Sequence, residues 1–179
     1  AVSKLAADMH LESMYKVKNF PMNIIRPSNG YGSGQLLYRI IPKAALMILK
    51  GQKFPLEGGG KVKKSFMHCR DIAEAIFAVL HKGKMGEIYN AGVDEPVSMR
   101  KLVEEVCLYL NKDFAESVSI TKGRIGEDKQ YWLDSTKLYN DTGWEAKISL
   151  KEGISETVKW VDTNLDKFDT ENLDFNLRA

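Results

Sequence analysis

The sequence has few of the residues that build metal sites or covalent cross-links. Of its 179 residues, two are cysteine, Cys69 and Cys107, and three are histidine, His10, His68 and His81. Their positions do not match the spacing of metal-ligand motifs, so we expect no metal ion. Both cysteines lie in apolar, helix-like segments. We interpret them as reduced core thiols of a cytoplasmic protein.

The sequence also lacks a long apolar run and a strong charge of either sign. No stretch approaches the roughly 18 apolar residues that span a bilayer. The net charge of +2 is too small to favour nucleic acid or a membrane as a partner. With 44% apolar and 28% charged residues and no internal repeat, the composition is that of a globular chain. Its length suits one domain with an appendage.

Short apolar runs alternate with amphipathic helical patterns, which predicts an α/β fold. We expect helices at residues 1–18, 42–50, 71–80, 98–110, 134–143 and 149–165, and strands at 22–25, 54–57, 65–68, 87–90 and 118–120. Gly51 suits a left-handed cap at the end of the second helix. Residues 122–129 are polar enough to form a loop. The acidic and amide-rich residues from 168 onward predict a frayed or partner-dependent tail.

Capping patterns mark three of these helices. Ser98 is a typical N-cap, and Ser149-x-x-Glu152 is a capping box. Asp71-x-x-Glu74 resembles a capping box as well. The helix that it would start should bury a row of apolar side chains, namely Ile72, Ala75, Ile76, Val79 and Leu80.

One polar stretch, Arg26-Pro27-Ser28-Asn29-Gly30-Tyr31-Gly32, stands where the predicted strand at 22–25 ends. In open α/β sheets, ligands bind beyond the carboxyl ends of the strands. Glycine lets the backbone approach a ligand, and asparagine can orient one through its amide. We therefore expect a binding crevice at this stretch.

Neither glycine-rich stretch matches a nucleotide phosphate loop. Gly30-x-Gly32-x-Gly34 places its third glycine one position too early for the dinucleotide pattern, and no helix follows directly. Gly58-Gly59-Gly60-Lys61 lacks the first glycine of a P-loop, and Val62 stands in place of Ser or Thr. The nearby lysines at 61, 63 and 64 suit either a solvated face or an anion site.

Together with Ser3-Lys4, the polar stretch resembles the extended short-chain dehydrogenase/reductases that act on nucleotide sugars. Their signatures are Arg-x-x-Asn-x-Tyr-Gly and a catalytic Tyr-x-x-x-Lys. The chain is most similar to their dTDP-glucose 4,6-dehydratase group. Further landmarks follow in the family's order up to about Trp160: Ile41-Pro42, Tyr89-Asn90-x-Gly92, Arg124-x-Gly126, Leu-Asp-Ser-x-Lys ending at Lys137, and Gly143-Trp144.

The resemblance implies a fold and a domain layout. It implies the C-terminal part of a Rossmann-like doubly wound sheet with a small α/β substrate-binding domain. Residues 1–52 would complete the NAD-binding domain, 53–167 would form mostly the nucleotide-sugar domain with interleaved Rossmann elements, and 168–179 the tail. The family's Tyr would stand just before Ala1, so we expect this chain to be the second half of an enzyme, inactive alone.

The resemblance also implies roles for single residues. Lys4 would be catalytic by lowering the pKa of the Tyr, and would contact NAD together with Pro27 and Ser28. The nucleotide-diphosphate sugar would contact the remaining set, namely Asn29, Arg39, Ile40, Pro55, Leu56, Glu57, Lys64, Asn90 and Arg124. Three positions depart from the dehydratase pattern: Lys64 replaces Arg, Glu127 replaces a frequent His, and Gly30 replaces a second Asn.

The implied reaction oxidises the sugar at C4, eliminates water across C5 and C6, and reduces C6, with NAD as the cofactor. The acid and base for the elimination would lie upstream of the Tyr. A nucleotide-sugar 4-epimerase of the same family is the first alternative. A non-catalytic nucleotide-sugar-binding or interaction module is the second, if the chain starts at Ala1. The full-length enzyme is expected to be a cytoplasmic homodimer.

Overall fold

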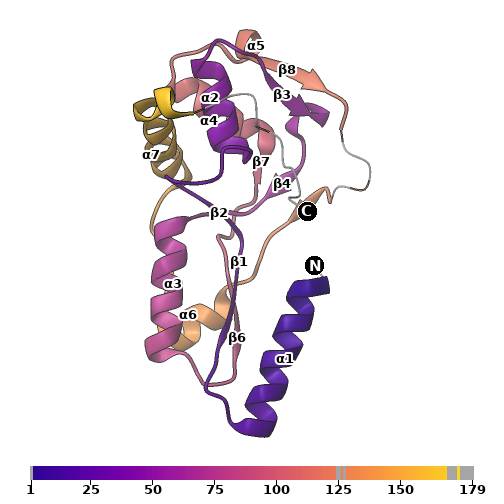
Figure 1. The fold of residues 1–179 in the computed structure, drawn as a ribbon, viewed down its shortest axis with the longest axis vertical. Coiled ribbons are helices and arrows are strands. Elements are labelled where there is room, and N and C mark those ends of the chain that lie inside the picture. The colour runs from indigo at the N-terminus through magenta and orange to yellow at the C-terminus, as the bar shows by residue number, and fades with distance from the viewer. Residues whose placement is uncertain (1, 124–125, 127, 169–172, 174–179) are drawn as a thin grey trace.

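The computed structural model describes residues 2–123, 126, 128–168 and 173, and all structural statements concern these. Helices cover both ends of an elongated body built around short parallel strands (Figure 1). The helices are α1 Val2–Lys18, α2 Ile40–Leu49, α3 Cys69–Lys82, α4 Met99–Tyr109, α5 Phe114–Ser117, α6 Thr136–Thr142 and α7 Leu150–Thr163, with 3-10 turns at Gly58–Gly60 and Leu165–Lys167. The strands are β1 Ile24–Pro27, β2 Asn29–Tyr31, β3 Phe54–Glu57, β4 Lys63–Lys64, β5 Phe66–His68, β6 Ile88–Ala91, β7 Val97–Ser98, β8 Val118–Thr121 and β9 Gln130–Tyr131.

The strand pairs join segments that are far apart in the sequence. β1 pairs with β6, β2 with β5, and β3 with β8, all in parallel. The central strand β4 pairs antiparallel with β7 and parallel with β9. Parallel pairing requires crossover connections; α2 lies on the connection from β2 to β5, and α4 on the connection from β3 to β8. The predicted α/β class with parallel strands is therefore correct.

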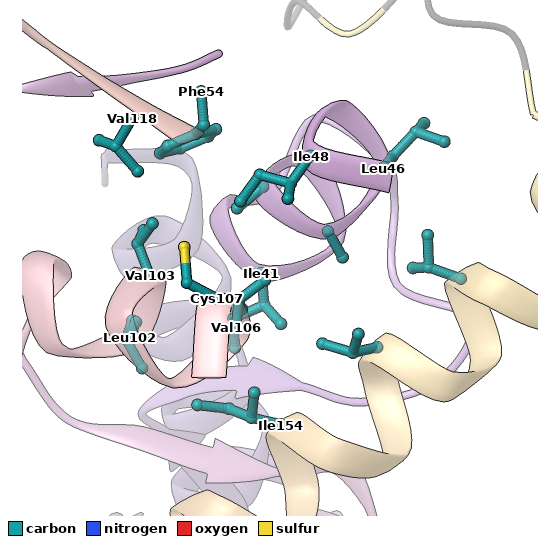
Figure 2. Close-up of a cluster of buried hydrophobic side chains, with 14 of the residues drawn as sticks. Ile41, Leu46, Ile48, Phe54, Leu102, Val103, Val106, Cys107, Val118 and Ile154 are labelled. Carbon is teal, nitrogen blue, oxygen red and sulfur yellow. The ribbon is translucent and has the colours of Figure 1, made fainter. Parts of the chain in front are cut away.

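The larger hydrophobic core lies between α2, α4 and α7. Figure 2 shows Ile41 and Ile48 of α2 facing Val103 and Val106 of α4, with Ile154 of α7 on the other side. α2 is almost wholly apolar, so it can be buried nearly all round. The apolar side of α7 is core packing, since Ile154, Val158 and Val161 are at most 1% exposed.

A second core lies between the β1/β6 pair, α3 and α6. Its buried members include Met67, Val79, Tyr89 and Leu138. The described residues therefore form two hydrophobic clusters. The predicted domain boundary after residue 52 stays a prediction. Leu173, the one described residue of the predicted tail beyond Phe168, packs into the larger core. The rest of that tail lies outside the described residues.

Gly51 and the Gly58–Gly60 turn have left-handed backbone conformations. Gly51 follows α2 with φ of 71°, as expected for a left-handed cap. The Gly58–Gly60 turn has positive φ at all three positions. A Cβ on Gly60 would lie 2.5 Å from the backbone N of Arg100, so this turn packs directly on the start of α4.

Two predicted element boundaries were wrong in detail. The strand predicted at 22–25 runs from Ile24 to Pro27, and α2 begins at Ile40 rather than at Pro42. Part of the polar stretch is also regular structure, because Asn29–Tyr31 forms β2, which pairs with β5. Backbone hydrogen bonds to a distant strand override the local glycine and asparagine signal here.

The prediction for the start of α3 was also wrong. The helix begins at Cys69, and His68 is its N-cap, accepting a hydrogen bond from Arg70 N at Nδ1. Asp71 instead accepts hydrogen bonds from Lys147 N at 3.1 Å and Ile148 N at 3.0 Å. The carboxylate therefore accepts hydrogen bonds from backbone N–H groups of a distant segment rather than from those of its own helix.

The burial predicted for α3 and for Cys69 was likewise partly wrong. Ala75 and Val79 are buried, but Ile76 is 47% and Leu80 71% exposed. Cys69 is exposed at the start of the helix, whereas Cys107 is buried in the larger core as predicted. Helical periodicity identifies the apolar side of α3: Ile72, Ala75 and Val79 pack against the second core, whereas Ile76 and Leu80 remain exposed.

Candidate functional site

The junction between β1 and β2 is the centre of the candidate site. Ser28 lies between the two strands, and its N–H donates to Ala91 O of β6 at 2.8 Å. Its hydroxyl is buried and has no hydrogen-bond partner among the described residues. Because most buried polar atoms in proteins are paired, an unpaired hydroxyl at a strand end is a natural contact for a bound group.

A pocket of about 700 Å³ lies beside this junction. Its walls come from β2, β3, β4 and β5, from the segment before α2, and from the first turns of α2 and α4. The larger core supports the back of the pocket, because Phe54 and Leu56 of β3 belong to both. Eight residues proposed from the sequence line it: Ser28, Asn29, Arg39, Ile40, Pro55, Leu56, Glu57 and Lys64.

Three of the proposed residues that the structure describes do not line the pocket, and a fourth proposed residue is not described. Pro27 lies in β1 and Asn90 in the neighbouring strand β6. Asn90 pairs with Arg26, the residue before Pro27. Lys4 is exposed in the first turn of α1. Arg124 lies outside the described residues, as does Glu127.

The charge of the pocket is predominantly positive. Among the described residues, three cationic side chains line it, those of Arg39, Lys43 and Lys64, against one carboxylate, that of Glu57. Arg39 also lies over the ring of Tyr38, with 5.3 Å between its guanidinium carbon and the ring centroid. Such a surplus of cations favours an anionic ligand, and the N-terminal end of α2 adds a partial positive charge.

Gln35 is a lining residue that the sequence analysis missed. Its Nε2 donates to Gly30 O at 2.6 Å, and its Oε1 is buried without a hydrogen-bond partner in the described part of the chain. Also missed were Gly30, Tyr38, Lys43, Phe54, Val62, Phe66, Met99 and Leu173. Lys43 could have been found, since it lies in the first turn of α2, which starts directly after its N-cap, Arg39.

α1 is joined to the β1/β6 pair by an ion pair. Arg26 Nη2 lies 2.7 Å from Asp8 Oδ2, and its Nε donates to the same oxygen at 3.0 Å. In Figure 1, α1 runs antiparallel to β1, so its first turn lies toward the carboxyl end of the strand. Lys4 is therefore at the same end of the strand pair as Ser28.

Tyr31, the aromatic residue of the polar stretch, is part of the core. It is 2% exposed and packs edge-on against Phe66 and His68. Burial, followed by the nearby charge of Asp71, raises the pKa of its phenol well above the ordinary 10. The phenol therefore stays protonated at neutral pH, and the ring packs against Gly153 of α7.

A family model described as GDP-mannose 4,6 dehydratase matches residues 1–157. The chain belongs to this family. It is 34% identical over 169 residues to the human dTDP-D-glucose 4,6-dehydratase, covering 92% of this chain and 48% of that relative. The predicted resemblance to the dehydratases among the extended short-chain dehydrogenase/reductases is confirmed.

Solved structures support the assignment to the 4,6 dehydratase family. The dTDP-glucose 4,6-dehydratase from Bacillus anthracis, in complex with NAD, is 33% identical with a TM-score of 0.85, covering 92% of this chain and 52% of that one. The UDP-glucose 4-epimerase from Thermotoga maritima is 23% identical with a TM-score of 0.86, covering 92% and 53%, which shows a shared fold. This chain thus spans about half the length of these relatives.

Proposed function

We propose that this chain is the C-terminal part of an NAD-dependent nucleotide-sugar 4,6-dehydratase and that its pocket binds a nucleotide-diphosphate sugar. The observation that carries the proposal is the pocket itself. Residues far apart in the sequence, from Asn29 to Lys64, meet around a cavity with three cations and one carboxylate. A diphosphate supplies the matching negative charge.

The pocket suggests a division of labour among its residues. Arg39 and Lys64 bind the diphosphate, together with Arg124, while Asn29 contacts the sugar and its phosphates. Ile40 packs against the ligand, and Pro55, Leu56 and Glu57 of β3 hold the nucleotide base. Lys64 supplies a point charge where an Arg would form a bidentate contact, so the phosphate geometry is less fixed than with Arg.

Asn90 is proposed as a further polar contact. It is partly buried on β6 at the register position of Arg26. The Asn90 side chain would therefore contact only a ligand that lies beyond the carboxyl end of the strand pair. Its contribution is therefore expected to be smaller than that of Asn29, which lines the pocket directly.

The residues at the carboxyl end of β1 fit an NAD cofactor in part. The buried, unpaired hydroxyl of Ser28 offers a polar contact next to Pro27, and Lys4 lies in the turn of α1 at the same end. NAD supplies a hydride acceptor for oxidation at C4 and a hydride donor for reduction at C6. The Lys4 ammonium would lower the pKa of a nearby Tyr through its positive charge, so that the Tyr could accept the proton of the sugar C4 hydroxyl during the oxidation.

We also propose that the full-length protein is a cytoplasmic homodimer. The free thiols Cys69 and Cys107 are typical of a reducing compartment. The exposed apolar residues Val2, Leu5 and Met9 of α1 favour burial against another surface. In the described part of the chain, no helix is long and apolar enough to cross a membrane.

A 4-epimerase is the second candidate, favoured by the shared fold with the Thermotoga maritima enzyme. The two reactions differ in the mass of their product. The dehydratase product is lighter than the substrate by one water, whereas an epimer has the substrate's mass.

Mass spectrometry therefore separates the two reactions. The protein expressed from its full reading frame is incubated with NAD and dTDP-glucose or UDP-glucose. We expect loss of one water. An unchanged mass with a new 4-epimer would favour the epimerase, and no conversion of either sugar nucleotide would contradict both enzyme proposals. The 179-residue chain alone is expected to give no product.

A further inference from the structure

The side-chain amide of Asn29 is held in one orientation by two hydrogen bonds. Its Nδ2 donates to Ser65 O at 2.9 Å, and its Oδ1 accepts a hydrogen bond from the Tyr131 hydroxyl, also at 2.9 Å. A reversed amide would place its carbonyl oxygen against Ser65 O, two acceptors with no hydrogen between them, and would leave the Tyr131 hydroxyl to accept rather than donate. Only one orientation therefore satisfies both neighbours.

The partner on the Nδ2 side is itself fixed. Ser65 is fully buried, and its carbonyl also accepts a hydrogen bond from Asn29 N at 3.2 Å. Its hydroxyl donates to Val93 O at 3.1 Å and accepts from Val93 N at 3.2 Å. Ser65 O is thus a rigid acceptor that selects the Nδ2 side of the amide, and the group that binds Oδ1 holds the other side of the amide in place.

Tyr131 occupies that position because of the strand pairing. β9 pairs in parallel with β4, so that Tyr131 is opposite Lys64, and Lys63 N donates to Lys129 O at 3.0 Å. Asn29 and Lys64 line the pocket, but Tyr131 does not. Tyr131 therefore contacts Asn29 from outside the cavity.

We propose that Tyr131 is a positioning residue that, together with Ser65 O, holds the Asn29 amide so that an N–H, rather than its carbonyl, is directed toward the pocket. The second amide hydrogen of Asn29 has no acceptor among the described residues. Asn29 thus acts as a donor to an acceptor oxygen of the ligand, either a phosphoryl or a sugar oxygen. The inference rests on the proposed function for the identity of the ligand, but not for the orientation of the amide.

Two readouts on the 179-residue chain test the proposal. The first is the NMR signal of the Asn29 side-chain amide without ligand. Tyr131→Phe removes only the hydroxyl and should shift this signal, while Tyr139→Phe, at an exposed tyrosine of α6, should not. The second is the dissociation constant for dTDP and UDP by calorimetry. Tyr131→Phe should raise it by about two- to tenfold, the range expected for one hydrogen bond.

A double-mutant comparison separates positioning from direct contact. In an Asn29→Ala background, Tyr131→Phe should cause no further loss of affinity, because no amide remains to be oriented. An equal loss in both backgrounds would overturn the proposal, and so would an unshifted Asn29 amide signal in Tyr131→Phe. If the unmodified chain binds neither nucleotide, the proposed function fails, while the amide signal still decides the role of Tyr131.

Discussion

Asp141 shows how a single carboxylate joins elements that are far apart in the sequence. Its Oδ1 accepts a hydrogen bond from Lys84 Nζ at 2.6 Å, and its Oδ2 accepts one from the Tyr89 hydroxyl at 3.0 Å. The hydrogen bond from Lys84, foremost, lowers the pKa of Asp141 below the ordinary 3.8. Burial raises the pKa of Tyr89, so its phenol remains the donor.

The lowered pKa predicts a pH-dependent effect of Asp141→Asn. A depressed carboxylate pKa contributes stability that is present above the ordinary value of 3.8 and is lost as the pH falls through the lower folded-state value. At pH 7, thermal melts should give a melting temperature lower by about 3 °C in Asp141→Asn. The difference should shrink as the pH falls below 4. Asp162→Asn, at an exposed position of α7, is the control. A difference that persists unchanged at pH 3 would contradict the electrostatic explanation.

At this scale, the sequence selected residues that line the pocket but could not find the contacts between side chains. The family resemblance selected Asn29 and Arg39 because their residue types and order match a motif, and Lys64 because it stands at the position of a family Arg. It could not find Gln35 or Tyr131, because neither belongs to the motifs quoted and each acts through a tertiary contact. The burial assigned to Cys69 failed for a similar reason, since exposure depends on what packs against a helix end.

At the scale of elements, local signals succeeded where a helix caps itself. Ser98 Oγ accepts a hydrogen bond from Lys101 N at 3.1 Å, and Ser149 Oγ one from Glu152 N at 3.2 Å, as the capping patterns predict. The same kind of pattern failed at Asp71, whose carboxylate binds the backbone before α7. The two cases differ only in tertiary position, which a three-residue spacing does not encode.

The corrected role of Asp71 predicts a large difference between two neighbouring acids. Asp71→Ala would leave the N–H groups of Lys147 and Ile148 without an acceptor, and Asp71 is only 3% exposed. We expect it to lower the free energy of unfolding by about 2–4 kcal/mol in urea denaturation. Glu74→Ala, at an exposed position, should change it by less than about 0.5 kcal/mol. Equal effects of the two substitutions would restore the capping-box interpretation.

At the scale of the whole molecule, groups of apolar side chains remain exposed on α1 and α3. α1 has no buried residue, and α3 exposes Ile76, Phe77 and Leu80. Residues three and four apart on a helix are neighbours, so these three form one patch. A patch of this kind on a globular chain favours association.

We therefore expect the 179-residue chain to self-associate. Sedimentation velocity should show a sedimentation coefficient that rises with protein concentration, and Phe77→Glu with Leu80→Glu should reduce this rise. Leu108→Glu, an equally exposed apolar position on α4, should leave it unchanged. A chain that stays monomeric and melts cooperatively at every concentration would show that the exposed apolar face needs no partner.

The most direct test of the central claim is a calorimetric titration of the chain with dTDP and with UDP. Lys64→Ala should weaken the binding by about tenfold, because it removes a charge-assisted contact to the diphosphate. Lys63→Ala, at the adjacent residue of β4, changes the same charge outside the pocket and should weaken binding by less than about twofold. Thymidine and uridine, which lack the diphosphate, should bind more weakly than the diphosphates and should not respond to Lys64→Ala. Equal effects of the two lysine substitutions, or no binding of either diphosphate, would contradict a nucleoside diphosphate site in this pocket.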